Sequence, residues 1–144
     1  MAAHPDGPVG VREGRLRLAA LTLLRVVAGF LFFQHGSPKL FGPLPGSPGT
    51  DPPVKGLSLL WFSGVLETFG GPLLMAGILT RPVAFLLAGE MAVAYFLRHA
   101  PRGFWPGDNR GELAALYCFV FLLFAAWGAG RWSVDEWLRG RQRT

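Results

Sequence analysis

Residues 113–129, LAALYCFVFLLFAAWGA, decide the fold because they contain no charged side chain. A helix that crosses a bilayer needs about 17–25 predominantly apolar residues, and this segment is long enough. A second stretch at 57–79 is nearly as apolar, and its polar side chains are Ser58, Ser63, Glu67 and Thr68. Two such segments in a chain of 144 residues predict a protein built within a membrane rather than a soluble helical bundle.

Two weaker segments complete the hydrophobic pattern. Within 16–33 and 82–97 the polar side chains are few, namely Arg17, Thr22, Arg25, Glu90 and Tyr95. The whole chain is 51% hydrophobic and only 16% charged, which leaves no polar faces to cover a soluble core. We therefore expect an all-α fold, an antiparallel four-helix transmembrane bundle with spans at about 16–41, 57–79, 82–98 and 111–129.

The four spans form one membrane domain, predicted at 15–131, with a different segment on each side. Residues 1–14 are rich in proline, glycine and charge, so we expect a flexible N-terminal tail. Residues 132–144 predict a short interfacial helix followed by a basic tail. Within it, Ser133 and Glu136 have the spacing of a capping box, and two tryptophans flank them.

The positive charges indicate topology. The formal net charge is +5, but the basic residues lie in the loops and tails, which argues against a nucleic-acid partner. Eight of them fall on the side of the two termini and five on the other side, with Arg25 inside a span. By the positive-inside rule both termini are predicted to be cytoplasmic. The single cysteine, Cys118, excludes an internal disulfide.

Three ionisable residues are predicted to share the middle of the bilayer. Counting from the ends of their spans at about 1.5 Å per residue places Arg25, Glu67 and Glu90 at similar depth. An unpaired charge there costs roughly 2.5–3.5 kcal/mol, so we expect the three to face inward as one network. In that network one glutamate would hold a proton or a strong hydrogen bond. A structural role in fixing the bundle and a role in proton or ligand handling both fit this pattern.

A second polar cluster is predicted at the outer ends of the spans. Because alternate spans point in opposite directions, these ends meet on one face, which brings together His35, Lys39, His99, Asn109 and Glu112. Such a cluster suits an anion or a quinone head group. Helix capping by the Asn109–Glu112 pair and simple interfacial placement of the others are the alternatives. No tight ligand motif is present, so no metal site is expected.

Several short motifs in order resemble the DoxX family of small four-span membrane proteins. They begin with Arg25 and Gly29 and continue through His35-Gly36 and Lys39-Leu40-Phe41-Gly42. The later ones are Gly64, Glu67-Thr68, Gly70-Gly71, Gly77, Thr80-Arg81, Ala88-Gly89-Glu90-Met91, Ala94-Tyr95, His99, Asn109, Gly111-Glu112 and Gly128 to Asp135. Each motif is weak alone, and their order and spacing carry the resemblance. It implies an inner-membrane protein of a bacterium.

The resemblance implies a link to membrane oxidoreductase systems, since related proteins are associated with thiosulfate:quinone oxidoreduction. The sequence has no flavin, haem or iron–sulfur motif, so electrons would come from a partner enzyme or a bound quinone. We therefore expect a non-catalytic or quinone-binding subunit, with catalytic residues unknown and homo-oligomerisation left open. A proton-coupled carrier for a small solute and a membrane scaffold for soluble enzymes are the alternative functions.

Overall fold

The computed structural model describes residues 8–43 and 53–141, and this part of the chain is largely helical. Its α-helices are α1 (Pro8–Phe41), α2 (Leu59–Ala76), α3 (Thr80–Ala94), α4 (Pro106–Asn109), α5 (Glu112–Trp127) and α6 (Val134–Arg141). A π-helical turn (Tyr95–His99) and a 3-10 turn (Ala100–Arg102) extend α3. The expected all-α class is confirmed.

Three helical segments are long and apolar enough to cross a membrane, and a fourth is shorter. The long ones are Gly14–Phe41, Leu59–Ala76 and Thr80–Arg102, which match three of the predicted spans. The fourth apolar helix, α5, has 16 residues and lies within the predicted span at 111–129. A 16-residue helix is about 24 Å long, somewhat less than the roughly 30 Å hydrocarbon core.

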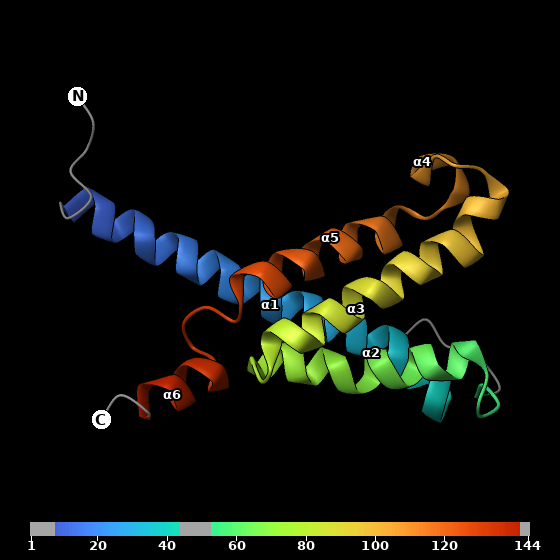
Figure 1. Ribbon diagram of the computed structural model, residues 1–144, viewed down its shortest axis with the longest axis horizontal. Coiled ribbons are helices and arrows are strands. Elements are labelled where there is room, and N and C mark those ends of the chain that lie inside the picture. The colour runs from blue at the N-terminus through green and yellow to red at the C-terminus, as the bar shows by residue number, and fades with distance from the viewer. Residues whose placement is uncertain (1–7, 44–52, 142–144) are drawn as a thin grey trace.

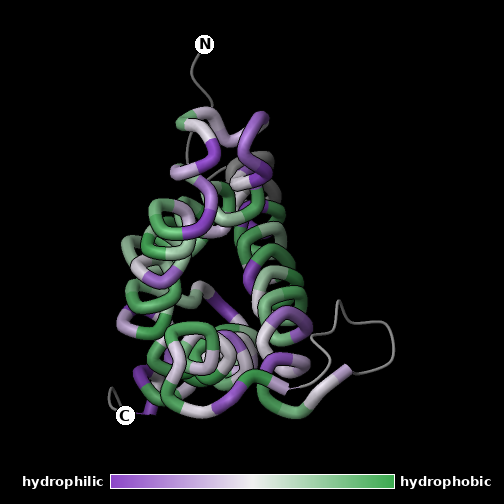
Figure 2. Tube along the Cα trace, turned by 90° about the vertical axis from the view of Figure 1, so that its right-hand side faces the viewer, coloured by the Kyte–Doolittle hydropathy of each residue, from purple (hydrophilic) through white to green (hydrophobic). Residues whose placement is uncertain are grey.

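The long helices are arranged as two pairs (Figure 1). α1 packs along α2, and α3 packs along α5, while α2 and α3 form a hairpin that joins the pairs. In Figure 1 the start of α1, the α2–α3 turn and α6 lie at one end of the molecule, and α4 lies at the other. Figure 2, seen from the α4 end, shows that hydrophobic residues predominate along the long helices.

Glycine makes the α1–α2 pair unusually close. A Cβ atom on Gly29 would lie 2.6 Å from the carbonyl oxygen of Gly71, and one on Gly71 would lie 2.6 Å from the carbonyl oxygen of Gly29. Any larger residue would force the two backbones apart. This is the small-residue packing expected between membrane helices.

A compact apolar core joins the two pairs. Phe32 of α1 lies edge-on against Phe121 of α5, with 4.7 Å between the ring centroids. Leu74 of α2 and Leu87 of α3 are also fully buried in this cluster. The core therefore contains residues from all four long helices. It holds the α1–α2 pair and the α3–α5 pair at a fixed angle to each other.

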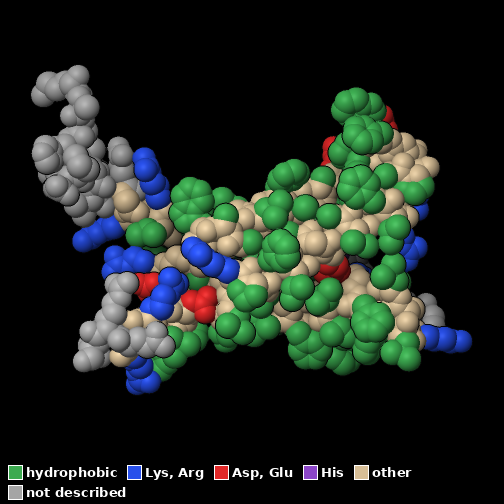
Figure 3. Space-filling view, viewed as in Figure 1, with side chains coloured by type: hydrophobic (Ala, Val, Ile, Leu, Met, Phe, Trp, Pro, Cys, Tyr) green, Lys and Arg blue, Asp and Glu red, His purple; other side chains and the backbone are tan. Residues whose placement is uncertain are grey.

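The outer surface is apolar where a soluble protein would be polar. Phe69, Phe85 and Phe119 are each more than half exposed, although they lie near the middle of their helices. Figure 3 shows hydrophobic side chains covering the centre of the molecule and Lys and Arg side chains gathered toward its two ends. This pattern is the one expected for a surface that contacts lipid.

The two terminal segments differ in part from expectation. α1 begins at Pro8, so residues 8–14, predicted to be part of a flexible tail, are helical, and residues 1–7 lie outside the described part. At the other end α6 begins just after Ser133, whose Oγ accepts a hydrogen bond from the backbone N–H of Glu136 at 3.2 Å. The predicted cap is therefore present, and residues 142–144 lie outside the described part.

Candidate functional site

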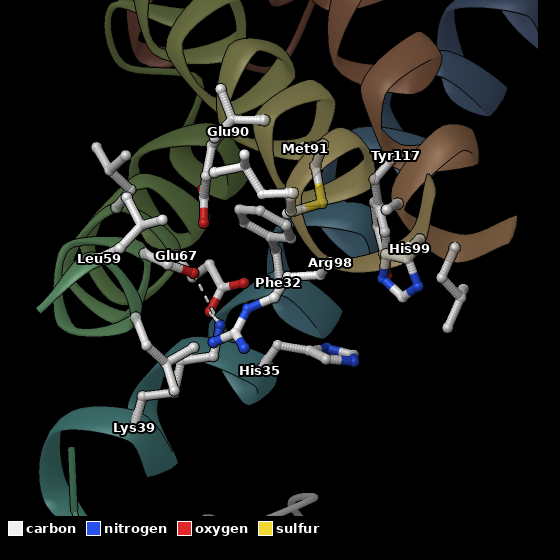
Figure 4. A pocket seen from close by; sticks show the side chains of 18 of the residues that line it. Phe32, His35, Lys39, Leu59, Glu67, Glu90, Met91, Arg98, His99 and Tyr117 are labelled. Atoms are coloured by element: carbon white, nitrogen blue, oxygen red, sulfur yellow. Dashed lines mark hydrogen bonds and ion pairs between the residues drawn. The ribbon is translucent and has the colours of Figure 1, made fainter. Parts of the chain in front are cut away.

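A cavity of about 490 Å³ lies between the two helix pairs, and all four long helices contribute to its walls. Its lining is mostly apolar, with Phe32, Leu66, Met91 and Tyr117 among the larger side chains. Figure 4 shows the labelled polar side chains projecting into the same space. The charged and other polar residues on the lining are His35, Lys39, Ser63, Glu67, Glu90, Arg98, His99, Arg110 and Tyr117.

The best-defined polar contact in the cavity is an ion pair between α1 and α2. Lys39 Nζ lies 2.5 Å from Glu67 Oε2 and also donates to Ser63 Oγ at 2.9 Å. The Glu67 side chain is only 4% exposed, and that of Lys39 is 17% exposed. The close backbone contact of the pair explains this placement, since a Cβ on Gly36 would lie 2.5 Å from the Cβ of Glu67.

Glu90 enters the cavity from α3 and is differently placed. Both of its carboxylate oxygens are buried, and within the described residues neither has a hydrogen-bond partner. A buried carboxylate without a partner is costly, so this group calls for a proton, a water molecule or a ligand. Figure 4 shows Glu90 above the Lys39–Glu67 pair, on the same side of the cavity.

The two histidines are oriented by backbone carbonyls. His35 Nδ1 lies 2.8 Å from the carbonyl oxygen of Leu31, and His99 Nδ1 lies 3.2 Å from that of Asn109. Because a carbonyl oxygen can only accept, each Nδ1 must carry the hydrogen. In a neutral ring this leaves Nε2 as the acceptor, so each histidine can receive a hydrogen bond from a ligand and can donate one when protonated.

Two of the residues predicted at the outer face do not line the cavity. Asn109 is buried at the end of α4, where its side-chain amide donates to the carbonyl of Gly103 at 2.6 Å and its Oδ1 accepts from Gly111 N–H at 2.7 Å. Glu112 is exposed in the first turn of α5, where a negative charge favours the helix N-terminus. The prediction that these two residues belong to the pocket is corrected, because they shape the loop and helix start beside it.

Arg25 is also separated from the two glutamates. Its guanidinium is 1% exposed and donates to the carbonyl of Ala129 and, at 2.8 Å, to the carbonyl of Trp132. The predicted network of Arg25 with Glu67 and Glu90 is therefore wrong with respect to Arg25. The physical reason is that the segment after α5 folds back over α1 and offers the arginine carbonyl acceptors outside the cavity.

Four polar lining residues were not among the predicted site residues. Ser63 lies one helical turn before Glu67, and this spacing was a usable signal because residues four apart share a helix face. Tyr117 is a polar residue within the charge-free stretch of α5. Arg98 lies at the end of the third predicted span, directly before His99, so its position was a signal, although an arginine at a span end can also extend to the interface. Arg110 gave no such signal.

Comparison with known proteins places the chain in a family. A family model described as DoxX matches residues 20–100, which is more than half of the chain. An uncharacterized protein of Haemophilus influenzae is 42% identical over 119 residues, covering 81% of this chain and 88% of that protein. An uncharacterized membrane protein of Mycobacterium tuberculosis is 29% identical over 153 aligned residues, covering 96% of this chain and 86% of that protein. No solved structure matches the chain significantly. With its long apolar helices and these matches, the chain belongs to the DoxX family and is a multi-pass membrane protein.

Proposed function

We propose that the cavity binds the head group of a membrane quinone, and that the protein is a quinone-binding subunit of an oxidoreductase system. The observation that carries this proposal is a largely apolar cavity whose lining includes charged groups. Among them is Glu90, a buried carboxylate with no hydrogen-bond partner in the described part of the chain. Its volume of about 490 Å³ falls within the usual range for small-molecule sites, roughly 300–1,000 Å³.

The apolar walls suit a ligand that arrives from the bilayer. Leu59 on α2 and Val93 and Leu97 next to the end of α3 line the cavity and are each about half exposed on the outer surface. These side chains connect the cavity with the lipid-facing surface between α2 and α3. An isoprenoid tail would leave the cavity along this route while the head group stays inside.

The polar groups suit the two oxygens of a quinone ring. Quinone oxygens accept hydrogen bonds, and the side-chain nitrogens of Lys39 and Arg98 on the cavity lining are donors. A quinol, in contrast, donates, and an ionised Glu90 or the Nε2 of a histidine can accept. Oxidation of a quinol releases two protons and two electrons; the protons would pass to Glu90 or a histidine, and the electrons to the partner enzyme.

The proposal includes the full topology of the bundle. In it α5 is the fourth span, extended at its ends by Gly111 and Gly128, and both termini are cytoplasmic. The asymmetry of the basic residues supports this orientation. The cavity residues His35 and His99 would then lie toward the outer face of a bacterial inner membrane.

The test is quinone binding by the full chain purified in mild detergent. Extracted lipids are analysed by mass spectrometry, and a tailed quinone is then titrated into the delipidated protein. We expect near-stoichiometric quinone in the wild type and at least tenfold weaker binding in His35→Ala and Glu67→Gln. Glu136→Gln, on the exposed surface of α6, is the matched control and should bind like the wild type. Equal binding by all four proteins, or none by any, would refute the proposal.

Proton-coupled transport of a small solute is the second candidate, and Glu90 is the observation that favours it. A carboxylate that lacks a partner can take up a proton on one side of the membrane and release it on the other. Purified protein in sealed vesicles with an imposed pH gradient separates the two functions. Solute accumulation that requires Glu90, without quinone binding, would favour the carrier.

A further inference from the structure

A second recess, of about 370 Å³, lies at the opposite end of the molecule from the cavity. It is lined by the start of α3, the residues just after α5, and α6, and α3 is distant in the sequence from the other two segments. Its lining includes two arginines, Arg81 and Arg139, and one acid, Asp135. The proposed quinone site does not use these residues.

The acid in this recess is already engaged. Asp135 Oδ1 accepts from Leu79 N–H at 2.8 Å, and Oδ2 accepts from Thr80 N–H at 2.9 Å. Its own N–H donates to the carbonyl of Gly77 at 2.9 Å. Asp135 therefore caps the start of α3. In the part of the chain that the structure describes, its carboxylate forms no direct ion pair with either arginine of the recess, although it lies near enough to Arg139 to interact electrostatically.

The two guanidinium groups retain most of their donors. Arg139 Nε donates to the backbone carbonyl of Asp135 at 3.2 Å, which holds the side chain, and its Nη2 lies 3.7 Å from Glu136 across an exposed surface. For Arg81, no hydrogen bond or ion pair is found within residues 8–43 and 53–141. Gly128 leaves space for it, because a Cβ there would lie 3.3 Å from Arg81 Nε.

The surroundings of the recess are those of a membrane interface. Leu79 and Leu138 line it and are 63% and 47% exposed. Trp132, just before α6, and Trp137, next to Leu138 in the sequence, are 71% and 55% exposed. Figure 3 shows cationic side chains gathered at the end where α6 lies, next to the hydrophobic centre of the molecule. Tryptophan and arginine beside apolar side chains are typical of the level of the lipid head groups.

We infer that this recess binds the phosphate of an anionic phospholipid between Arg81 and Arg139. A guanidinium presents paired donors that match phosphate oxygens, and two of them on one recess form a clamp. The apolar Leu79, Pro82 and Leu138 provide contact for the upper acyl chains. These apolar walls favour a lipid over a free phosphate ion. A bound lipid would join α3, α5 and α6 at the membrane surface.

The test measures lipid retained by the full chain in detergent after exchange into equal amounts of phosphatidylglycerol and phosphatidylcholine. Native mass spectrometry counts the lipids that remain bound. We expect one phosphatidylglycerol retained in preference to phosphatidylcholine. A guanidinium that hydrogen-bonds the phosphate contributes charge-assisted bonds in addition to its general attraction to an anionic surface, so Arg81→Gln and Arg139→Gln should each lower this preference by about tenfold or more.

Two controls separate the recess from general charge attraction. Arg131→Gln removes the same charge beside α6, outside the recess lining, and should lower the preference by no more than the roughly fivefold effect of general surface attraction. Arg81→Lys keeps the charge but loses the paired donors, and should give an intermediate value. Thermal unfolding of each variant identifies any that fails to fold, and Arg139→Gln, at an exposed position, then provides the decisive measurement. An equal loss in Arg131→Gln, no preference in the wild type, or complete displacement by inorganic phosphate would overturn the inference.

Discussion

Replacing Lys39 by methionine tests whether the Lys39–Glu67 pair supports the fold of the site. The substitution keeps the length and apolar stem of the side chain and removes the charge 2.5 Å from Glu67 Oε2. Glu67 is then a buried carboxylate, 4% exposed, with its cationic partner gone. Breaking a buried pair in this way typically costs about 3–5 kcal/mol.

A limit to this cost follows from protonation. A glutamate with an ordinary pKa of about 4.3 can be neutralised at pH 7 for about 3.7 kcal/mol, since each pH unit corresponds to about 1.4 kcal/mol. At pH 5 the same neutralisation costs only about 1 kcal/mol. The neutral form is the one that the variant's folded state favours, so the destabilisation must grow as pH rises above about 4.3.

We therefore expect Lys39→Met to lower the free energy of unfolding by up to about 3.7 kcal/mol at pH 7 and by about 1 kcal/mol at pH 5. Equilibrium unfolding in mixed detergent and sodium dodecyl sulfate micelles, followed by tryptophan fluorescence, provides the measurement. The double variant Lys39→Met/Glu67→Gln has no charge to neutralise and should recover most of the loss at pH 7. An equal loss at both pH values, or a double variant as unstable as the single one, would show that the reasoning is wrong.

Three further predictions concern other contacts. Gly71→Ala should destabilise the protein by about 1–3 kcal/mol in the same unfolding assay because it separates α1 from α2, whereas Gly89→Ala, with open space at its Cβ position, should be neutral or slightly stabilising. Arg25→Met should cost about 2–3 kcal/mol by leaving two carbonyls unbonded, and should make the chain beyond α5 sensitive to limited proteolysis. Burial raises the pKa of Asp135, but the hydrogen bonds from α3 outweigh it and set the pKa below its ordinary value. Asp135→Ala should therefore cost about 1 kcal/mol at neutral pH, and the wild type's advantage should disappear as pH falls below about 4 in thermal unfolding scans.

The positions of the helices could be predicted from the sequence because hydropathy and helix length are linked in a bilayer. The three long apolar helices lie where 16–41, 57–79 and 82–98 were expected. The antiparallel order of the spans likewise explains why His35 and His99, far apart in the chain, reach one cavity. Both inferences depend on distance along the helix axis, which residue counting gives directly.

The pairing of the ionisable residues could not be predicted from the sequence. Counting residues along a span gives the depth of a side chain in the membrane, but not the direction in which it points or how far it extends. Arg25 was predicted to lie with the glutamates at the same depth, yet it faces the segment after α5. Lys39 was assigned to the helix end, yet its long side chain reaches Glu67. Sequence reasoning also gave no reason to expect that Glu90 would be left without a partner, since that depends on the angle between the two helix pairs.

The contact between Arg25 and the segment after α5 has a consequence for how the protein is made. Arg25 and Ala129 are 104 positions apart in the chain, so the ribosome synthesises the arginine long before its acceptors exist. During most of translation, the first span carries a cation whose native partners are absent. The fold can therefore be completed only after α5 and the segment that follows it have been synthesised. Chains truncated before Ala129 would retain an unsatisfied arginine in the first span, and membrane proteases could recognise such incomplete chains.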